Sequence, residues 1–309
     1  MVQTLKNVLI LGGNGFVGKS FKNSEMFNKS FKTYYSDRRD TDLTKYDQVE
    51  SLFQNVQPEI ILNCAGKSGG IVATSSNPYS YLSENLKIYL NIYEAIKKLQ
   101  CVDLINLGSS AMYPKDSPIP IKESSLMAGN LEESNSHYSL SKIVGIELGK
   151  ALNTKTINVT TLIPTNLYGP HDNFDPLYSN VVPGLIRKIH EAKVNNISEY
   201  VAWGSGEPFR ELLYVDDLIN AVTEIIQNNL KSSIINIGSG EEIRIKDLVF
   251  KICEIIGYDG NIVFDKSKPD GIYRKTLDSS IINNLGWNPT TNLDKGLKIT
   301  YRWLTKNLV

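Results

Sequence analysis

Tyr138 and Lys142 are four positions apart in a stretch with helical spacing, and Ser109 follows an apolar run upstream. A phenol is a weak acid at neutral pH, since its ordinary pKa is about 10. An ammonium one turn away on the same helix face favours the phenolate and brings the phenol toward acid–base chemistry. A serine hydroxyl can hold the carbonyl oxygen that receives the proton. These residues indicate proton transfer at a carbonyl, although a Tyr-x-x-x-Lys pair alone also fits a solvated helix face.

A glycine-rich turn follows the first apolar run of the chain. Gly12, Gly15 and Gly18 form a GxxGxxG pattern ahead of a helix-like stretch. The first glycine permits the tight turn, the second lets a pyrophosphate approach the backbone, and the third lets the helix pack closely on the strand. The pattern predicts a dinucleotide site, and the remaining cofactor-binding candidates within this turn are Asn14, Phe16 and Val17.

The end of the second predicted strand bears on the choice of cofactor, because both acidic and basic residues stand there, in Ser36-Asp37-Arg38-Arg39-Asp40. An acidic residue at this place binds the ribose hydroxyls of NAD, whereas arginine holds the 2′-phosphate of NADP. The adjacent pair Arg38 and Arg39 favours NADP(H) over NAD(H). Asp42 and Leu43 are predicted at the adenine edge.

Small residues end the third predicted strand, at Cys64, Ala65 and Gly66. They would let the cofactor lie across the strand ends, and Leu107 at the end of the next strand is a further cofactor-binding candidate. Lys67 is either a surface charge or a residue that faces the pyrophosphate.

Apolar runs alternate with helical patterns along most of the chain. This alternation predicts βαβ units and an α/β fold with a Rossmann-type doubly wound parallel sheet. The predicted strands are Asn7–Leu11, Phe31–Tyr35, Ile60–Asn63, Leu104–Leu107, Val159–Ile163 and Ile234–Ile237. The predicted helices are Tyr81–Leu99, Ser139–Leu152, Val215–Gln227 and Lys246–Ile256.

The alternation becomes irregular after about Pro170, which predicts a smaller subdomain over the open end of the sheet. We expect residues 1–170 to form the NAD(P)-binding domain, with residues 211–240 returning to it. Residues 171–210 and 241–309 would form the substrate-binding subdomain.

Composition limits the classes of partner. Lysine plus arginine and aspartate plus glutamate both number 33 in 309 residues, which argues against nucleic acid or an anionic membrane as a bulk electrostatic partner. The three cysteines are far apart and the three histidines form no ligand motif, so we expect free thiols and no metal. With no signal-peptide profile and no apolar run of membrane-spanning length, the sequence predicts a cytoplasmic protein.

Several motifs together resemble the extended short-chain dehydrogenase/reductase superfamily and, within it, the GDP-L-fucose synthase family. They occur in family order from residue 7 to about residue 287. The motifs are Ser109-Ser110-x-x-Tyr113-Pro114, the segment from Pro164 to Phe174, Trp203-Gly204-Ser205-Gly206, Arg210-Glu211-Leu212-Leu213-Tyr214-Val215-Asp216-Asp217 and Ser267-Lys268-Pro269-Asp270-Gly271.

The resemblance implies a reaction and roles for particular residues. The family's bifunctional enzymes epimerise C3 and C5 of GDP-4-keto-6-deoxymannose and then reduce C4 with NADPH. It implies Ser109, Tyr138 and Lys142 as the catalytic residues, and a homodimer built on the two long predicted helices. The nicotinamide would lie against Pro164, Thr165, Asn166 and Leu167, and the substrate-binding candidates are Ser110, Asn166, Asn180, Lys188, Trp203, Arg210 and Asp270.

The sequence departs from the family pattern at two positions. Family epimerases carry a cysteine two residues after the catalytic serine and a histidine before the Val-x-Pro segment, and here these residues are Ala111 and Asn180. Epimerisation needs two groups that gain and lose protons near neutral pH. A methyl and a carboxamide do neither. His137, His171 and the more remote Tyr178 are poor substitutes, so the resemblance implies a retained reductase without the epimerase.

We therefore expect an NADPH-dependent C4 reductase of a GDP-4-keto hexose, 6-deoxyhexose or heptose, acting in nucleotide-sugar biosynthesis for surface polysaccharide. The alternative is a bifunctional GDP-L-fucose synthase with relocated acid–base groups. A 4-epimerase with bound NAD and a non-catalytic, cofactor-sensing protein are further alternatives, since a fold does not fix a function. The residues after Ser109 are not the carboxylates that a 4,6-dehydratase would need.

Overall fold

A six-stranded parallel sheet forms the centre of the computed structural model, which describes residues 5–268 and 270–307. The strand order is β2-β1-β3-β4-β5-β9, and every neighbouring pair is parallel. The predicted α/β class with a Rossmann-type sheet is confirmed. The strands are β1 (Asn7–Leu11), β2 (Lys32–Ser36), β3 (Ile60–Asn63), β4 (Val102–Leu107), β5 (Ile157–Pro164) and β9 (Ile234–Ile237).

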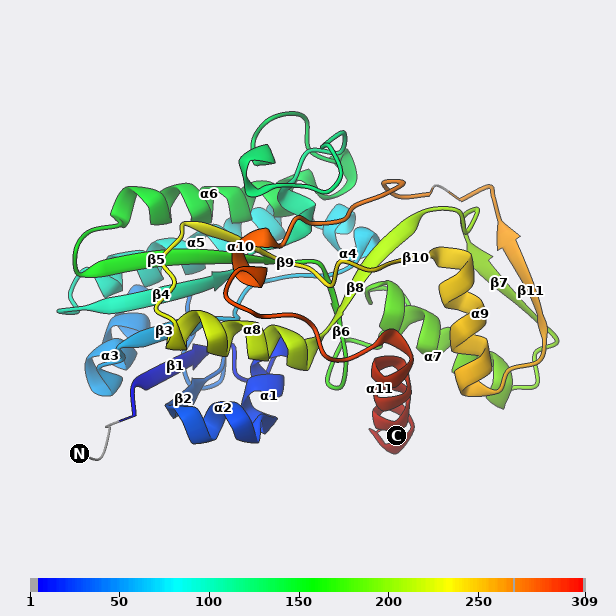
Figure 1. Ribbon diagram of the computed structural model, residues 1–309, viewed down its shortest axis with the longest axis horizontal. Coiled ribbons are helices and arrows are strands. Elements are labelled where there is room, and N and C mark those ends of the chain that lie inside the picture. Colours follow the sequence, from blue (N-terminus) through cyan, green and yellow to red (C-terminus); the bar gives the residue numbers. More distant parts are fainter. Residues whose placement is uncertain (1–4, 269, 308–309) are drawn as a thin grey trace.

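Helices cover both faces of this sheet (Figure 1). Alternate residues of β1 show why, since Val8 and Ile10 join one apolar core while Leu9 and Leu11 join the other. One face is covered by α1 (Phe16–Asn23), α2 (Glu25–Ser30) and α8 (Val215–Gln227), and the other by α3 (Tyr46–Val56), α5 (Pro78–Ile96) and α6 (Ser136–Leu152). The strand order reverses beside β1, and open α/β sheets bind ligands at the carboxyl ends of the strands at such a point.

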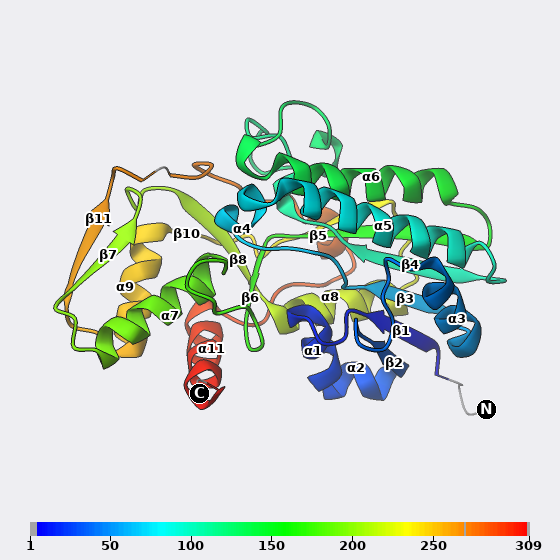
Figure 2. The same cartoon turned by 180° about the vertical axis from the view of Figure 1, so that it is seen from behind.

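A second apolar core lies beside the end of this sheet (Figure 2). It is built around two small sheets and three helices. The sheets contain β6 (Asn166–Tyr168), β8 (Phe209–Tyr214) and β10 (Glu242–Arg244), and β7 (Glu199–Trp203) with β11 (Asn261–Asp265). The helices are α7 (Val181–Val194), α9 (Ile245–Ile256) and α11 (Leu293–Asn307). Ile282, from α10 (Ser280–Asn283), and Trp287 pack instead on the core of the large sheet.

Glu211 in β8 is fully buried, and its hydrogen bonds join the large sheet to the part of the molecule that holds the second apolar core. Its carboxylate accepts hydrogen bonds from the backbone N–H of Gly240 at 2.8 Å and of Leu277 at 2.9 Å. Its backbone carbonyl accepts from Thr165 Oγ1 at 3.0 Å and from Asn166 Nδ2 at 3.2 Å. Glu211 therefore ties the end of β5 to the loops that follow β9 and precede α10.

We expect Glu211→Ala to lower the free energy of unfolding by about 2–4 kcal/mol, because two buried N–H groups lose their acceptor. Urea denaturation measures this loss. Glu241→Ala, which removes an exposed carboxylate from the same region, is the matched control and should leave the midpoint unchanged. A loss below about 1 kcal/mol would contradict the structural role given to Glu211.

Candidate active site

Helix α6 carries both Tyr138 and Lys142, and its first turns face the carboxyl end of β4. Lys142 is buried, and its Nζ donates a hydrogen bond to the carbonyl oxygen of Leu107 at 3.0 Å. The same Nζ lies 5.9 Å from the centroid of the Tyr138 ring. The structure therefore fixes the ammonium beside the phenol, as the helical spacing predicts.

Ser109 stands at the same end of β4. It precedes the short 3-10 helix η1 (Ser110–Met112), and its Oγ accepts a hydrogen bond from the backbone N–H of Ala111 at 3.2 Å. Ser139 Oγ donates to the carbonyl of Ala111 at 2.9 Å, which ties η1 to α6. Ser110 is buried beside these residues. The three catalytic candidates thus come from elements that are bonded to one another.

Asn85 of α5 was missed by the sequence analysis. Its buried side chain accepts from the backbone N–H of Lys67 at 2.7 Å and donates to the carbonyl of Lys67 at 3.1 Å. It also donates to Ser141 Oγ at 3.3 Å, one residue before Lys142. A Cβ at Gly66 would lie only 3.3 Å from Lys142 Nζ. Asn85 therefore clamps the 66–67 turn onto α6.

Cys64 precedes this turn and Lys67 belongs to it, and the two side chains have different environments. Burial raises the pKa of the Cys64 thiol to about 12, against the smaller opposite effect of Lys142, so the thiol stays protonated. Lys67 Nζ forms an ion pair with Glu84 at 3.1 Å and a hydrogen bond with Ser80. Lys67 is therefore bound to α5, and the structure gives it a local partner.

The glycine turn after β1 fits a dinucleotide. Gly12 has φ +78°, and Gly15 N–H donates to the Gly12 carbonyl at 2.9 Å. A Cβ at Gly18 would lie 2.2 Å from the Gly12 oxygen, and one at Gly12 would lie 2.8 Å from Ala65 N. These close approaches exclude side chains at both positions. Gly15 caps α1 without a side-chain hydrogen bond, so the first backbone N–H groups of the helix, from Phe16 onward, suit a phosphate. Asn14 lies in the same turn, and Val17 is the second residue of α1.

Basic and acidic side chains meet at the end of β2. The Ser36 hydroxyl there is fully enclosed and has no hydrogen-bond partner among the described residues. Arg39 Nη2 pairs with Asp37 Oδ2 at 3.2 Å, and Asn14 also bonds this carboxylate. The hydrogen bond from Arg39 holds the pKa of Asp37 below its usual range. The Asp37 carboxylate is thus occupied, whereas Arg38 is exposed.

The predicted adenine contacts have local roles in this structure. Asp42 Oδ1 accepts from Thr44 Oγ1 at 2.8 Å, which lowers the pKa of Asp42. Leu43 is only 8% exposed and packs into the core beneath α3 and α5. Their contact with adenine stays a prediction.

The predicted nicotinamide segment runs from the end of β5 into β6. Pro164 pairs with Ile237 of β9, and Leu167 packs on the core of the large sheet. Thr165 and Asn166 both bond the carbonyl of Glu211, as described above. The amide nitrogen of Asn166 is therefore engaged, while its amide oxygen accepts no hydrogen bond from the described residues.

Two substrate-binding candidates come together in the second part. Arg210 Nη1 donates to the carbonyls of Phe209 at 2.6 Å and Ile272 at 2.8 Å. Burial lowers the pKa of Arg210, and the charges of Glu132 and Asp270 oppose that shift. Asp270 itself accepts from Ser205 N–H at 2.8 Å. The fold therefore brings the two candidates Arg210 and Asp270 close enough for their charges to interact.

The other substrate-binding candidates are more exposed. Trp203, at the end of β7, is 53% exposed, with Lys268 Nζ 5.8 Å from its ring centroid. Lys188 lies on the exposed side of α7, and Asn180 is the exposed residue at the start of that helix. Pro269, part of the motif that carries Asp270, lies outside the described residues.

Lys275 is a cation that the sequence analysis did not single out. Burial lowers its pKa to about 8, with Glu132 acting to raise it and Arg210 to lower it. Glu132 precedes α6, and its charge also acts on Arg210, as does that of Asp270. The cations Arg210 and Lys275 and the carboxylates Glu132 and Asp270 therefore gather between β8 and the loop that leads to Tyr138. The guanidinium and ammonium of this group are donors that suit an anionic ligand.

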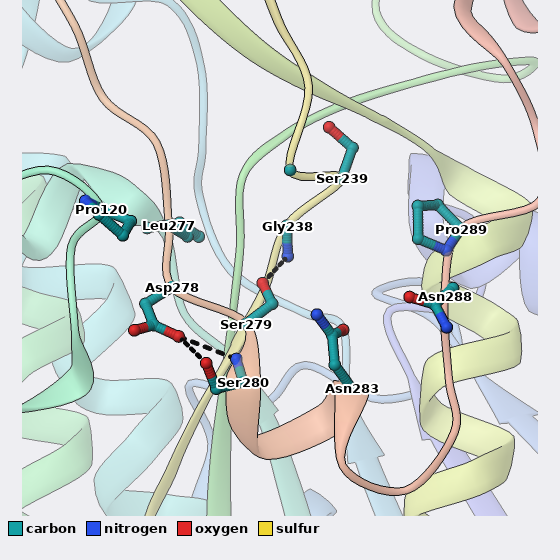
Figure 3. Close-up of a pocket in the computed structure, with 11 residues that line it drawn as sticks. Pro120, Gly238, Ser239, Leu277, Asp278, Ser279, Ser280, Asn283, Asn288 and Pro289 are labelled. Carbon is teal, nitrogen blue, oxygen red and sulfur yellow. Dashed lines mark hydrogen bonds between the residues drawn. The ribbon is translucent and has the colours of Figure 1, made fainter.

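A cavity of about 280 Å³ lies elsewhere, beyond the end of β9 (Figure 3). Gly238, Ser279 and Asn283 are among its lining residues, and none of the predicted site residues is. Within residues 5–268 and 270–307, no group of His, Cys, Asp and Glu side chains is arranged to hold a metal ion. No helix in that described part has the length and apolar character to span a membrane.

Residues 8–238 match the NAD dependent epimerase/dehydratase family. The chain is 40% identical over 304 residues to the probable GDP-L-fucose synthase 1 of Oryza sativa subsp. japonica, covering 98% of this chain and 93% of that protein. Among solved structures, a GDP-6-OMe-4-keto-L-xylo-heptose reductase from C. jejuni superimposes with a TM-score of 0.88 at 28% identity, covering 99% of both chains. The GDP-mannoheptose C4 reductase from Campylobacter jejuni, solved with NADP bound, has a TM-score of 0.85 at 29% identity, covering 99% of this chain and 100% of that one.

Proposed function

The chain belongs to the NAD dependent epimerase/dehydratase family, and we propose that it reduces the C4 keto group of a GDP-linked sugar with NADPH, without epimerising C3 or C5. One observation carries the proposal. Lys142 is fixed beside Tyr138 at the end of β4, where Ser109 also stands, while Ala111 and Asn180 occupy the positions of the family's proton-transfer pair. Such a site can neutralise an oxygen anion but has no matched pair to deprotonate a carbon.

The residues divide the work in a simple way. The nicotinamide, when bound, supplies the hydride. Ser109 holds the carbonyl oxygen of the sugar through its hydroxyl, and Tyr138 donates the phenolic proton to that oxygen. Lys142 stabilises the phenolate that remains, and its bond to the Leu107 carbonyl keeps it in place. A solvent proton then restores Tyr138.

The choice of NADP(H) is supported at the end of β2. The exposed Arg38 can donate to a 2′-phosphate, whereas the Asp37 carboxylate that would bind ribose hydroxyls is already occupied by Arg39. The relative solved with NADP bound supports the same choice.

The nucleotide and sugar are assigned to the second part of the molecule. Arg210 and Lys275 would meet the diphosphate, and Trp203 offers a flat face to the base. The similar proteins include GDP-fucose synthases and GDP-heptose reductases, so a 6-deoxyhexose and a heptose are the sugars to test. A homodimer packed through α5 and α6 belongs to the same proposal.

The proposal is tested by one reaction in D2O that contains the protein, NADPH and GDP-4-keto-6-deoxymannose. We expect one hydride to be delivered to C4 and no deuterium at C3 or C5, as read by mass spectrometry and NMR. Ring deuterium beyond that of a sample without protein would favour the bifunctional alternative. If NADPH is not oxidised with this sugar or with a GDP-4-keto heptose, the reductase proposal is wrong.

A pH dependence follows from Lys275. We expect GDP affinity to be full below about pH 8 and to fall by up to about tenfold per pH unit above it, because the free amine loses its proton there while the bound diphosphate favours the ammonium. The charged groups around this amine are Glu132 and Arg210, with Asp270 acting on Arg210. Calorimetric titration of GDP measures the effect.

A matched pair of variants isolates this amine. Lys275→Arg keeps its charge at every accessible pH and should give a flat profile, whereas Lys266→Gln, which removes an exposed lysine nine residues earlier in the sequence, should follow the unmodified protein. A pH profile of Lys275→Arg that still falls above about pH 8 would assign the titration to another group.

A further inference from the structure

Tyr81 of α5 is held against the catalytic tyrosine. Tyr81 is 6% exposed. Its ring meets the Tyr138 ring edge to face, with centroids 6.4 Å apart and an interplanar angle of 85°. Lys67 Nζ lies 5.3 Å from the Tyr81 centroid and is itself bound to Ser80 and Glu84. The ring therefore has a fixed position next to the reacting phenol.

The hydroxyl of Tyr81 has no hydrogen-bond partner among the described residues. In that part of the chain, some polar side-chain atoms are both fully enclosed and without a hydrogen-bond partner, namely Ser36 Oγ, Asp172 Oδ2 and Arg244 Nε. Tyr81 Oη also lacks a partner, but it is not fully enclosed. This oxygen therefore reaches open space. A buried phenol whose hydroxyl is reachable and unsatisfied is suited to a polar ligand.

The residues around the Tyr81 hydroxyl show which part of the molecule this oxygen faces. The Tyr81 hydroxyl lies 3.0 Å from the place of a Cβ on Gly69. The next residue, Gly70, donates its backbone N–H to the Tyr178 carbonyl at 3.2 Å, two residues before Asn180. The Tyr81 ring thus contacts Tyr138, while its hydroxyl lies toward the turn that approaches Asn180. The proposed sugar would lie in this region for its C4 oxygen to reach Tyr138.

We propose that the Tyr81 hydroxyl donates a hydrogen bond to a ring hydroxyl of the GDP-linked sugar and so helps to select the substrate. The inference rests on the proposed function, because it places the sugar beside Tyr138. Burial raises the pKa of Tyr81, and the charge of Glu84 adds to this effect. The phenol is therefore a donor at neutral pH and not a base, so it does not restore the missing epimerase pair. A site that hydrogen-bonds a substrate hydroxyl rejects analogues that lack it.

The test compares two ligands in Tyr81→Phe, which removes the hydroxyl and keeps the ring that packs on Tyr138. We expect calorimetry to show GDP-mannose binding weakened by about three- to tenfold, with GDP binding unchanged, since the lost contact is to the sugar alone. The kcat/KM for GDP-4-keto-6-deoxymannose should fall by a similar factor, while the Kd for NADPH stays the same. Tyr79→Phe, which changes an exposed tyrosine of the same helix, should alter none of these values.

The outcomes separate this inference from the proposed function. Equal affinities for GDP-mannose in Tyr81→Phe and the unmodified protein would overturn the sugar contact, and so would an equal loss for GDP, which would indicate a general structural effect. Loss of a C3 or C5 deuterium exchange that the unmodified protein performs would make Tyr81 an acid–base group and overturn its role as a donor only. If the unmodified protein does not oxidise NADPH, the proposed function fails, yet the two binding measurements still decide the role of Tyr81.

Discussion

Tyr138→Phe is expected to lower kcat about a thousandfold while leaving the Kd for NADPH within about twofold. The change removes one oxygen, which is the proton donor in the proposed reaction. The phenyl ring keeps its edge-to-face contact with Tyr81, and Lys142 keeps its bond to the Leu107 carbonyl. Because the glycine turn and the end of β2 lie outside this contact, the cofactor site should remain intact.

Stopped-flow absorbance of NADPH at saturating sugar measures the turnover, and fluorescence titration measures the affinity for NADPH. Tyr178→Phe is the control, since this exposed tyrosine is the remote substitute acid near Asn180 and is not needed for C4 reduction. Turnover of Tyr138→Phe at the level of the unmodified protein would show that another group protonates the sugar oxygen. A large loss of turnover in Tyr178→Phe would identify that group.

The strands and helices of the large sheet could be predicted because their buried residues form local apolar patterns in the sequence. The strands β1, β3 and β9 coincide with apolar runs, and α8 begins and ends at the predicted Val215 and Gln227. The second strand was placed one residue early, at Phe31–Tyr35 in place of Lys32–Ser36. The predicted start of α5 was three residues late, because Pro78 and the capping Asn77 begin the helix before its apolar stripe does.

The small sheets could not be predicted in the same way. β6 and β10 have three residues each, and β10 exists through its antiparallel pairing with β8. A three-residue segment such as Glu242–Arg244 carries no readable alternation, so pairing with a distant strand decides its conformation. The pattern after Pro170 therefore indicated irregularity without revealing β10.

The candidate site likewise contains residues that local sequence motifs predict and residues that only the fold reveals. Tyr138, Lys142 and the glycines of the cofactor turn stand in short motifs whose spacing has a direct geometric meaning. Asn85 and Lys275 take their roles from partners far along the chain, so no local pattern marks them. Tyr81 belongs to the buried side of α5, where sequence spacing alone identifies it as a core residue. Only the fold brings its hydroxyl toward the space beside Tyr138.

The absence of the proton-transfer pair leads to the second large effect, which is a gain of function. Ala111 lies in η1, which Ser139 bonds to the catalytic helix, and Asn180 begins α7 after the turn that Gly70 contacts. Both positions therefore border the space assigned to the sugar. The double change Ala111→Cys and Asn180→His would place a thiol and an imidazole there, and both groups exchange protons near neutral pH.

We expect this double variant to incorporate at least about one deuterium per product molecule at C3 or C5 in D2O, whereas the unmodified protein incorporates none, because hydrogen next to a carbonyl exchanges once a base can reach it. NMR of the product measures the exchange, and NADPH oxidation confirms that reduction continues. The matched control, Ala111→Ser with Asn180→Gln, adds similar bulk without groups that titrate near neutral pH, so it should remain free of exchange. If the double variant still reduces C4 but incorporates no deuterium, residues 111 and 180 do not account for the difference from the family's epimerases, and the distinction must lie in how the sugar ring is held above Tyr138.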